Sequence, residues 1–234
     1  MVYNRLKVLQ DWFLPGSCLL CAAPVGFGAD FCRDCEASLP RPGSTCRICA
    51  APLEGAEDTD APCGECQKRP PKFARVRTLF TYAPPVDRLI QNLKYHRRLE
   101  LARVLGDRLA GCLASLNEPR PDVIVPVPLH RSRLRERGYN QSLELARPIA
   151  RRLRLPLDYR SVRRTRATAP QTELPREQRR KNVRGAFQAD NVFEGRRVAV
   201  VDDVMTSGHT AAALAECLRR AGAKEILVWV VARA

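Results

Sequence analysis

The residues with the clearest chemistry lie at 197–210, in the order Arg-Val-Ala-Val-Val-Asp-Asp-Val-Met-Thr-Ser-Gly-His-Thr. The apolar run predicts a strand buried on both faces of a parallel sheet. It delivers Asp202 and Asp203 to its carboxyl end, the edge where open α/β sheets bind ligands. Small polar residues and an amphipathic helix over 211–220 follow, and backbone N–H groups at a helix N-terminus favour an anion. The pattern predicts a phosphate on the loop and a diol on the two acids.

The same stretch resembles the signature of type I phosphoribosyltransferases: a hydrophobic strand, an Asp-Asp pair and a Thr-(Thr/Ser)-Gly-x-Thr loop. The resemblance implies that Asp202 and Asp203 hydrogen-bond the ribose hydroxyls of phosphoribosyl diphosphate. It also implies that the 5′-phosphate is held by Thr206, Ser207, Gly208, His209 and Thr210. The alternative is that the acids only cap a strand-to-helix turn, where Asp and Thr are common. Strand, acids, glycine and helix in the required order favour the binding site.

Eight of the ten cysteines form four Cys-x-x-Cys pairs. Two thiolates on one tight knuckle occupy two corners of a zinc tetrahedron, and a second knuckle supplies the others. The spacing therefore predicts two structural zinc sites. Pairing in sequence order gives a first site of Cys18, Cys21, Cys32 and Cys35 and a second of Cys46, Cys49, Cys63 and Cys66. An interleaved pairing requires more chain crossing, and disulfides are disfavoured because nothing indicates secretion.

Length and charge limit the class of protein. A chain of 234 residues suits one ordinary domain and a small module. The net charge of +15 favours polyanionic partners, either nucleic acid or phosphorylated metabolites. No stretch has the length of a membrane span, and the N-terminus lacks the pattern of a signal peptide. We therefore predict a cytoplasmic protein without an integral membrane segment.

The composition divides the chain into three parts. Residues 1–14 have apolar side chains at near-helical spacing and predict a short helix. Residues 15–71 carry the cysteine pairs among small residues, so metal must order this double zinc ribbon. Residues 72–234 read as a parallel sheet flanked by helices, the type I phosphoribosyltransferase-like α/β fold. Strands are expected at 76–82, 122–127, 197–203 and 226–231, and helices at 84–114, 140–153 and 211–220.

Two basic stretches strengthen the resemblance. The first follows a strand directly and occupies the diphosphate-loop position, with candidate binding residues Pro128, Leu129, His130, Arg131, Arg133 and Arg137. The second, at 163–187, is polar and without a core pattern, and such a loop can close over a substrate. Its candidate hood residues are Arg179, Arg180 and Lys181. The alternative for this segment is a solvated basic surface loop or an RNA-binding arm.

Four features together resemble the ComF family over nearly the whole chain: the cysteine pairs, the Pro-Val-Pro-Leu-His and Arg-Gly-Tyr-Asn-Gln stretch, the segment at 171–187 and the Asp-Asp loop. This family consists of double-zinc-ribbon, phosphoribosyltransferase-like proteins. The resemblance implies a role in natural transformation, in which single-stranded DNA is internalised beside a helicase partner. It does not by itself imply a transferase reaction.

Three functional hypotheses follow. The first is a DNA-uptake factor that retains a site for phosphoribosyl diphosphate and Mg²⁺, and we rank it first. The second is an active phosphoribosyltransferase of nucleotide salvage, in which Mg²⁺ and arginines stabilise the departing diphosphate while the acids orient the ribose. The third is a regulator that binds phosphoribosyl diphosphate as a signal without turnover.

Overall fold

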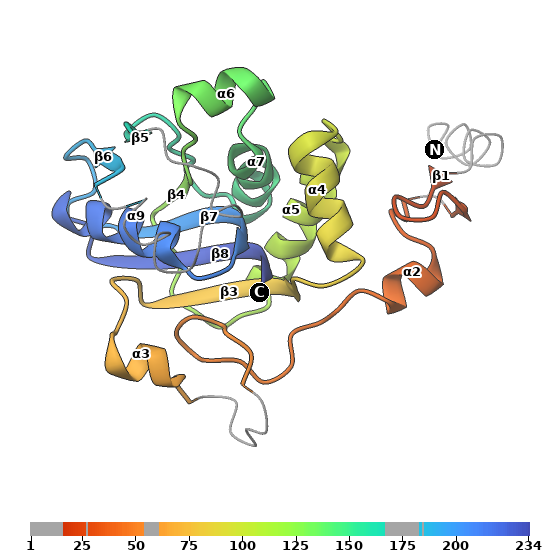
Figure 1. The fold of residues 1–234 in the computed structure, drawn as a ribbon, viewed down its shortest axis with the longest axis horizontal. Coiled ribbons are helices and arrows are strands. Elements are labelled where there is room, and N and C mark those ends of the chain that lie inside the picture. Colours follow the sequence, from red (N-terminus) through yellow and green to blue (C-terminus); the bar gives the residue numbers. More distant parts are fainter. Residues whose placement is uncertain (1–15, 27, 54–60, 167–182, 184) are drawn as a thin grey trace, which may run out of the picture.

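The computed structural model describes residues 16–26, 28–53, 61–166, 183 and 185–234 (Figure 1). The helix expected at 1–14 lies outside these residues. The strands are β1 Gly16–Ser17, β2 Pro24–Val25, β3 Arg75–Thr81, β4 Val123–Pro126, β5 Val162–Arg164, β6 Phe187–Ala189, β7 Arg197–Met205 and β8 Glu225–Arg233. The helices are α2 Arg33–Ala37, α3 Gly64–Lys68, α4 Val86–Tyr95, α5 Glu100–Ala114, α6 Arg131–Arg137, α7 Gln141–Leu153 and α9 His209–Arg220.

A four-stranded sheet forms the centre of the molecule. Its strand order is β3-β8-β7-β4, and each neighbouring pair is parallel. The central strands β7 and β8 contain the apolar runs 198–201 and 226–232, as strands covered on both faces require. The predicted fold class, a parallel sheet flanked by helices and preceded by cysteine ribbons, is confirmed (Figure 1).

The two faces of the sheet belong to two separate cores, because successive side chains of a strand point to opposite faces. Val198 and Val200 of β7 pack in one core with Leu214 and Leu218 of α9. Ala199 and Val201 pack in the other core, which α4, α5 and α7 cover. The first cysteine ribbon joins the core beneath α5, whereas the second joins the core beneath α9.

The regular elements lie within two residues of their expected bounds, with the stretch at 84–114 divided into α4 and α5. Within the α/β part of the chain, three further elements were not expected. The helix α6 lies inside the basic stretch after β4, and the short strands β5 and β6 pair antiparallel at the two ends of the polar segment. Among the described residues, no helix has both the length and the apolar character needed to cross a membrane.

Candidate functional site

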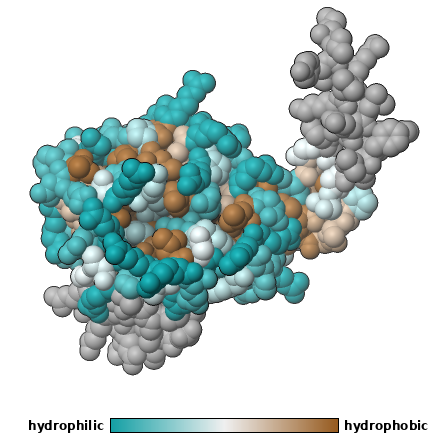
Figure 2. Space-filling view, turned by 90° about the horizontal axis from the view of Figure 1, so that it is seen from above, coloured by the Kyte–Doolittle hydropathy of each residue, from teal (hydrophilic) through white to brown (hydrophobic). Residues whose placement is uncertain are grey.

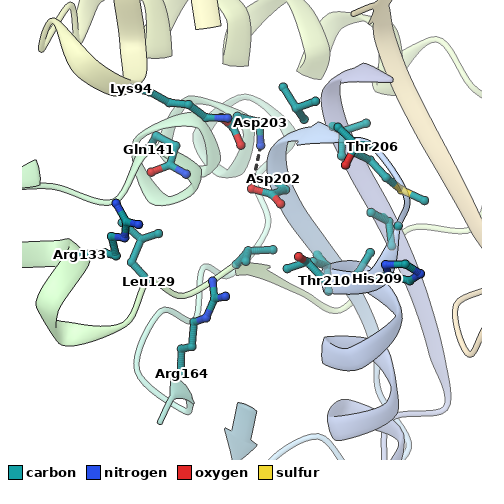
Figure 3. Close-up of a pocket in the computed structure, with 18 of the residues that line it drawn as sticks. Lys94, Leu129, Arg133, Gln141, Arg164, Asp202, Asp203, Thr206, His209 and Thr210 are labelled. Atoms are coloured by element: carbon teal, nitrogen blue, oxygen red, sulfur yellow. Dashed lines mark hydrogen bonds and ion pairs between the residues drawn. The ribbon is translucent and has the colours of Figure 1, made fainter. Parts of the chain in front are cut away.

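A cavity of about 370 Å³ lies at the carboxyl ends of β7 and β4. Figure 3 shows the carboxylates of Asp202 and Asp203 in its centre, between arginines on one side and the loop before α9 on the other. The face in Figure 2, seen from above Figure 1, is mostly hydrophilic, with hydrophobic residues visible in its hollows. The candidate residues that line the cavity are Leu129, His130, Arg133, Arg137, Asp202, Asp203, Thr206, Gly208, His209 and Thr210.

The loop after β7 begins a helix directly at the cavity. Gly208 has φ +74° and is the N-cap of α9, which runs for 12 residues behind it. A Cβ at this position would lie 2.6 Å from Cε of Met205. The positive φ and this close contact both favour glycine at position 208. Ser207 is the one predicted loop residue outside the cavity lining, and its Oγ lies 3.0 Å from Nδ1 of His209. The result is a helix N-terminus open to an anion.

The two acids differ in their surroundings. Asp203 is buried, and its Oδ2 lies 2.6 Å from Nζ of Lys94 on α4. Asp202 is partly exposed, and its Oδ1 accepts hydrogen bonds from the Ser142 hydroxyl at 2.8 Å and from the Asp203 N–H at 2.9 Å. Asp202 is therefore the carboxylate that a ligand in the cavity can reach.

Burial and mutual repulsion separate the proton affinities of the pair. Burial and, after it, the charge of Asp203 raise the pKa of Asp202 to about 7, against the opposing effects of Ser142 and Lys94. Burial alone would also raise the pKa of Asp203, but the ammonium of Lys94 outweighs it and lowers that pKa. Asp202 therefore takes up a proton near pH 7, while the ammonium of Lys94 neutralises the buried charge of Asp203.

The arginines after β4 lie on a helix, and the helix decides which of them face the cavity. Residues four apart share a face. Arg133 and Arg137 line the cavity, whereas Arg131, two positions earlier, points elsewhere. Of the binding residues predicted in this stretch, Pro128 and Arg131 do not line the cavity, so their binding role stays a prediction without this support.

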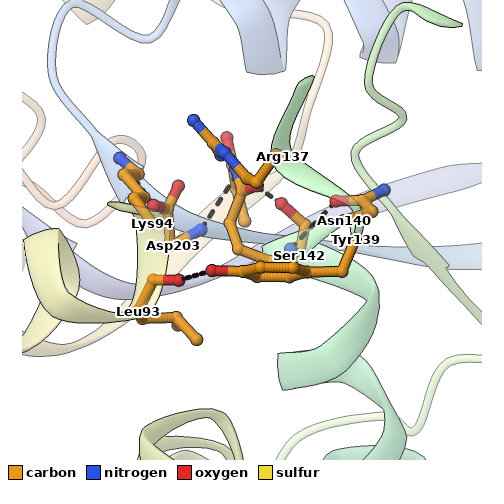
Figure 4. A network of polar contacts seen from close by, with 9 residues as sticks. Leu93, Lys94, Arg137, Tyr139, Asn140, Ser142 and Asp203 are labelled. Carbon is orange, nitrogen blue, oxygen red and sulfur yellow. Dashed lines mark hydrogen bonds and ion pairs between the residues drawn. The ribbon is translucent and has the colours of Figure 1, made fainter. Parts of the chain in front are cut away.

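The Arg-Gly-Tyr-Asn-Gln stretch builds the wall of the site (Figure 4). Gly138, at φ +84°, ends α6. The Tyr139 hydroxyl donates to the Leu93 carbonyl and so fixes the end of α4. The Asn140 side chain caps α7 through Ser142 N–H and donates to the Val127 carbonyl at 3.0 Å. These contacts place Lys94 and Ser142 beside the acids.

Three residues of the site were missed by sequence reasoning: Lys94 and Arg164, which line the cavity, and the buried Ser142, which donates to Asp202. Lys94 stands in a basic stretch and resembles its exposed neighbours, although its position four residues after buried Ile90 on α4 was an available signal. Burial lowers the pKa of Arg164, against the opposing charge of Asp202. The predicted hood residues Arg179, Arg180 and Lys181 lie outside the described residues.

The eight predicted ligand cysteines form two clusters, paired in sequence order. Within each cluster the sulfur atoms all lie within 4.8 Å of one another. The residue after each first knuckle, Ala22 and Ala50, has positive φ, so the two clusters repeat one backbone turn. The second knuckle of each begins a short helix, α2 or α3. Four thiols at such separations fit a closed tetrahedral zinc site.

The second cluster also has donors aimed at sulfur. The backbone N–H groups of Cys63, Ile48 and Cys49 donate to Sγ of Cys46 at 3.1, 3.4 and 3.5 Å. Burial raises the pKa of Cys46, but these donors outweigh it and lower that pKa to about 7. Since zinc binds thiolates, the donor set fits the metal that the spacing predicted.

Two models of known protein families match parts of the chain. A family model described as a double zinc ribbon domain matches residues 9–67, and one described as a phosphoribosyl transferase domain matches residues 139–234. The DNA utilization protein YhgH of Escherichia coli (strain K12) is 38% identical over 227 residues, covering 94% of this chain and 98% of that protein.

Two relatives are named for competence. Competence protein F of Haemophilus influenzae is 35% identical over 179 residues, covering 74% of this chain and 78% of that protein. Competence protein ComFC of Bacillus subtilis is 24% identical over 147 residues, covering 62% and 58%. With its paired cysteine clusters, its acid pair and these relatives, the chain belongs to the ComF family of double-zinc-ribbon proteins with a phosphoribosyltransferase-type domain.

Proposed function

We propose that the chain binds phosphoribosyl diphosphate with Mg²⁺ in the cavity at the end of β7 and serves the internalisation or use of single-stranded DNA. The observation that carries the proposal is the composition of one cavity. Its lining combines an acid pair, a helix N-terminus and two arginines that share a face of α6. Phosphoribosyl diphosphate offers a diol, a phosphomonoester and a diphosphate to these three groups.

Each group has a role suited to its chemistry. Asp202 accepts hydrogen bonds from the ribose hydroxyls, while Lys94 and Ser142 hold the acid pair in place. The N-terminus of α9 receives the 5′-phosphate, because the positive end of the helix dipole favours an anion there. Arg133 and Arg137 face the diphosphate as bidentate donors. Bound with the diphosphate, Mg²⁺ would supply further neutralisation of its charge, and carboxylates are ligands that it accepts.

The DNA role rests on the relatives and on charge. The relatives are named for DNA utilization and competence. A net charge of +15 supports electrostatic binding to a phosphate backbone, which weakens steeply with salt. With 6% aromatic residues, stacking platforms are few, so the contact is mainly with phosphates. A DNA-uptake helicase is the partner that fits this role.

The first test is calorimetric titration of phosphoribosyl diphosphate with Mg²⁺. The wild type should bind, and Asp202→Asn/Asp203→Asn should lose at least tenfold in affinity, about 1.4 kcal/mol. The exposed Asp190→Asn is the matched control and should bind as the wild type does. No binding by the wild type would refute the proposed site.

The second test separates the remaining hypotheses. Diphosphate release with a nucleobase acceptor would establish a transferase, and binding without release across all acceptors would favour a site kept for regulation of DNA handling. Single-stranded DNA affinity should fall steeply as salt rises. DNA affinity that is unmeasurable at low salt, with and without phosphoribosyl diphosphate, would contradict the DNA role.

A further inference from the structure

Arg233 is a buried cation that lies between the second cysteine cluster and the loop before α9. It is the last residue of β8, where its backbone pairs with Met205 of β7, and it is 8% exposed. A buried guanidinium requires hydrogen-bond acceptors for its donors. In the part of the chain that the structure describes, these acceptors are main-chain oxygen atoms of Cys49, Met205, Thr206 and Ala234, and no Asp or Glu side chain pairs with Arg233.

The carbonyls come from two parts of the chain that are far apart in sequence. Nε of Arg233 donates to the Cys49 carbonyl at 2.9 Å, within the first knuckle of the second cluster. Nη1 donates to the Met205 carbonyl at 3.1 Å and to the Thr206 carbonyl, at the entrance to the loop. One planar group therefore joins a predicted zinc ligand to the loop.

The orientation of the Met205 and Thr206 carbonyls also fixes the orientation of the N–H groups in the same peptide units. A peptide unit is planar and trans, so its C=O and N–H point in opposite directions. Holding the carbonyls of Met205 and Thr206 toward Arg233 points the N–H groups of Thr206 and Ser207 away from it. Thr206 and Gly208 line the cavity. Arg233 thus fixes the two peptide units that lead into the anion site.

The second cluster has a further attachment to the sheet, and the first cluster lies elsewhere. The Val76 N–H donates to the Ile48 carbonyl at 2.7 Å, which ties the same knuckle to β3. The first ribbon instead contacts α5, where Arg103 pairs with Asp30 and Arg108 pairs with Glu36. In Figure 1 the first ribbon lies to the side of the sheet that bears α4, away from β7.

We infer that Arg233 is a positioning residue that couples the second zinc site, and not the first, to the anion loop. The inference rests on the proposed phosphate site and extends it. With zinc bound, the Cys49 carbonyl is held in place and Arg233 spans the gap to the loop. Without zinc, the four cysteines of the second cluster are not joined by a metal. The Cys49 carbonyl is then no longer held in place, and Arg233 loses one of its fixed hydrogen-bond acceptors.

The test compares full-length variants, all prepared with zinc present, in two measurements. Calorimetry measures phosphoribosyl diphosphate with Mg²⁺, and amide hydrogen exchange measures the backbone at 205–210. Arg233→Met and Cys63→Ser/Cys66→Ser should each weaken binding on the order of tenfold, within the usual range of coupling between sites, and speed exchange in the loop. Cys32→Ser/Cys35→Ser is the matched control, because it opens the first site only, and should change neither.

A charge-conserving variant covers the event that Arg233→Met fails to fold. Arg233→Lys keeps the cation, but a single ammonium cannot span both carbonyl groups, and the same loosening is expected with both zinc ions retained. Exchange at 205–210 that is unchanged in Arg233→Lys and in the second-site variant would overturn the coupling, as would an equal effect of the first-site variant. If the wild type gives no binding heat, the proposed function fails, while the exchange measurement still decides the coupling.

Discussion

Lys94 decides the electrostatics of the acid pair. Adjacent carboxylates in a poorly solvated site repel each other, and both can be charged only with a nearby cation. Its ammonium lies 2.6 Å from Asp203, and its side chain is 22% exposed. The ion pair keeps Asp203 charged and leaves Asp202 with the elevated pKa, so the more accessible acid is also the one that takes up a proton near neutrality. Lys94, a cation on α4, therefore sets the protonation states of Asp202 and Asp203 before a ligand binds.

Lys94→Met should lower the free energy of unfolding by about 3 kcal/mol at pH 7.5, since it leaves a buried carboxylate without its partner. The lowered pKa of Asp203 contributes stability that is present above an ordinary Asp pKa of about 4 and is lost as pH falls through the folded value. In the Met variant Asp203 takes up a proton more readily. The difference from wild type should therefore shrink at pH 5, as measured by urea denaturation.

Arg88→Met is the matched control, because it removes a cation from the exposed side of the same helix. Its effect should stay within about 0.5 kcal/mol at either pH. Equal losses for the Lys94 variant at both pH values would show that packing, and not charge balance, is its contribution.

At the scale of elements, the loop before α9 depends on the backbone of one residue. A side chain at φ +74° costs about 1–2 kcal/mol. Gly208→Ala should therefore reduce stability by about that amount and also weaken phosphoribosyl diphosphate binding, because the added Cβ displaces Met205 beneath the loop.

Gly195→Ala separates the two effects of that substitution. Gly195 has φ +69° with no atom within 4 Å of an added Cβ, so it carries a similar backbone cost far from the loop. It should lose stability and keep binding unchanged in calorimetry. A Gly208 variant that binds as tightly as the Gly195 variant would remove the loop from the proposed site.

The packing of α5 against α7 depends on a second glycine. A Cβ at Gly106 would lie 2.5 Å from Cγ of Pro148 and 2.7 Å from the Leu145 carbonyl. Gly106→Ala should destabilise by about 1–2 kcal/mol in thermal or urea unfolding, because overpacking outweighs the better helix propensity of alanine. Gly111→Ala on the same helix meets only the Arg152 guanidinium at 3.5 Å and should stabilise by about 0.5–1 kcal/mol. Equal effects would contradict this account.

At the scale of the whole molecule, the two zinc sites differ in protection. The first cluster includes Cys21, which is exposed, whereas Cys46, Cys49 and Cys66 of the second are buried with the sheet core. We expect two equivalents of zinc per chain, released to a chromogenic chelator in two phases. Cys32→Ser/Cys35→Ser should remove the faster phase. Cys112 lies outside both clusters, so Cys112→Ser should release zinc in the same two phases as the wild type. A single phase in the wild type would refute a difference in protection between the two sites.

The sequence by itself determined the features that depend on local order. Apolar strands, the acid pair with its glycine loop and the cysteine knuckles each carry their chemistry within a few neighbouring residues, so the fold class, the loop and the pairing of the clusters could be predicted. The domain boundaries and the ligand roles of the predicted site residues stay predictions.

Only the tertiary structure decided which distant side chains join these features. Lys94 comes to Asp203 from α4, and Arg233 reaches Cys49 across 184 positions of sequence. Helical spacing from Ile90 hints that Lys94 faces inward, but no local pattern in a chain with 40 Lys and Arg residues identifies the partner of either cation. The physical reason is that a buried charge finds its partner through the packing of helices and strands, which spacing along the chain does not encode.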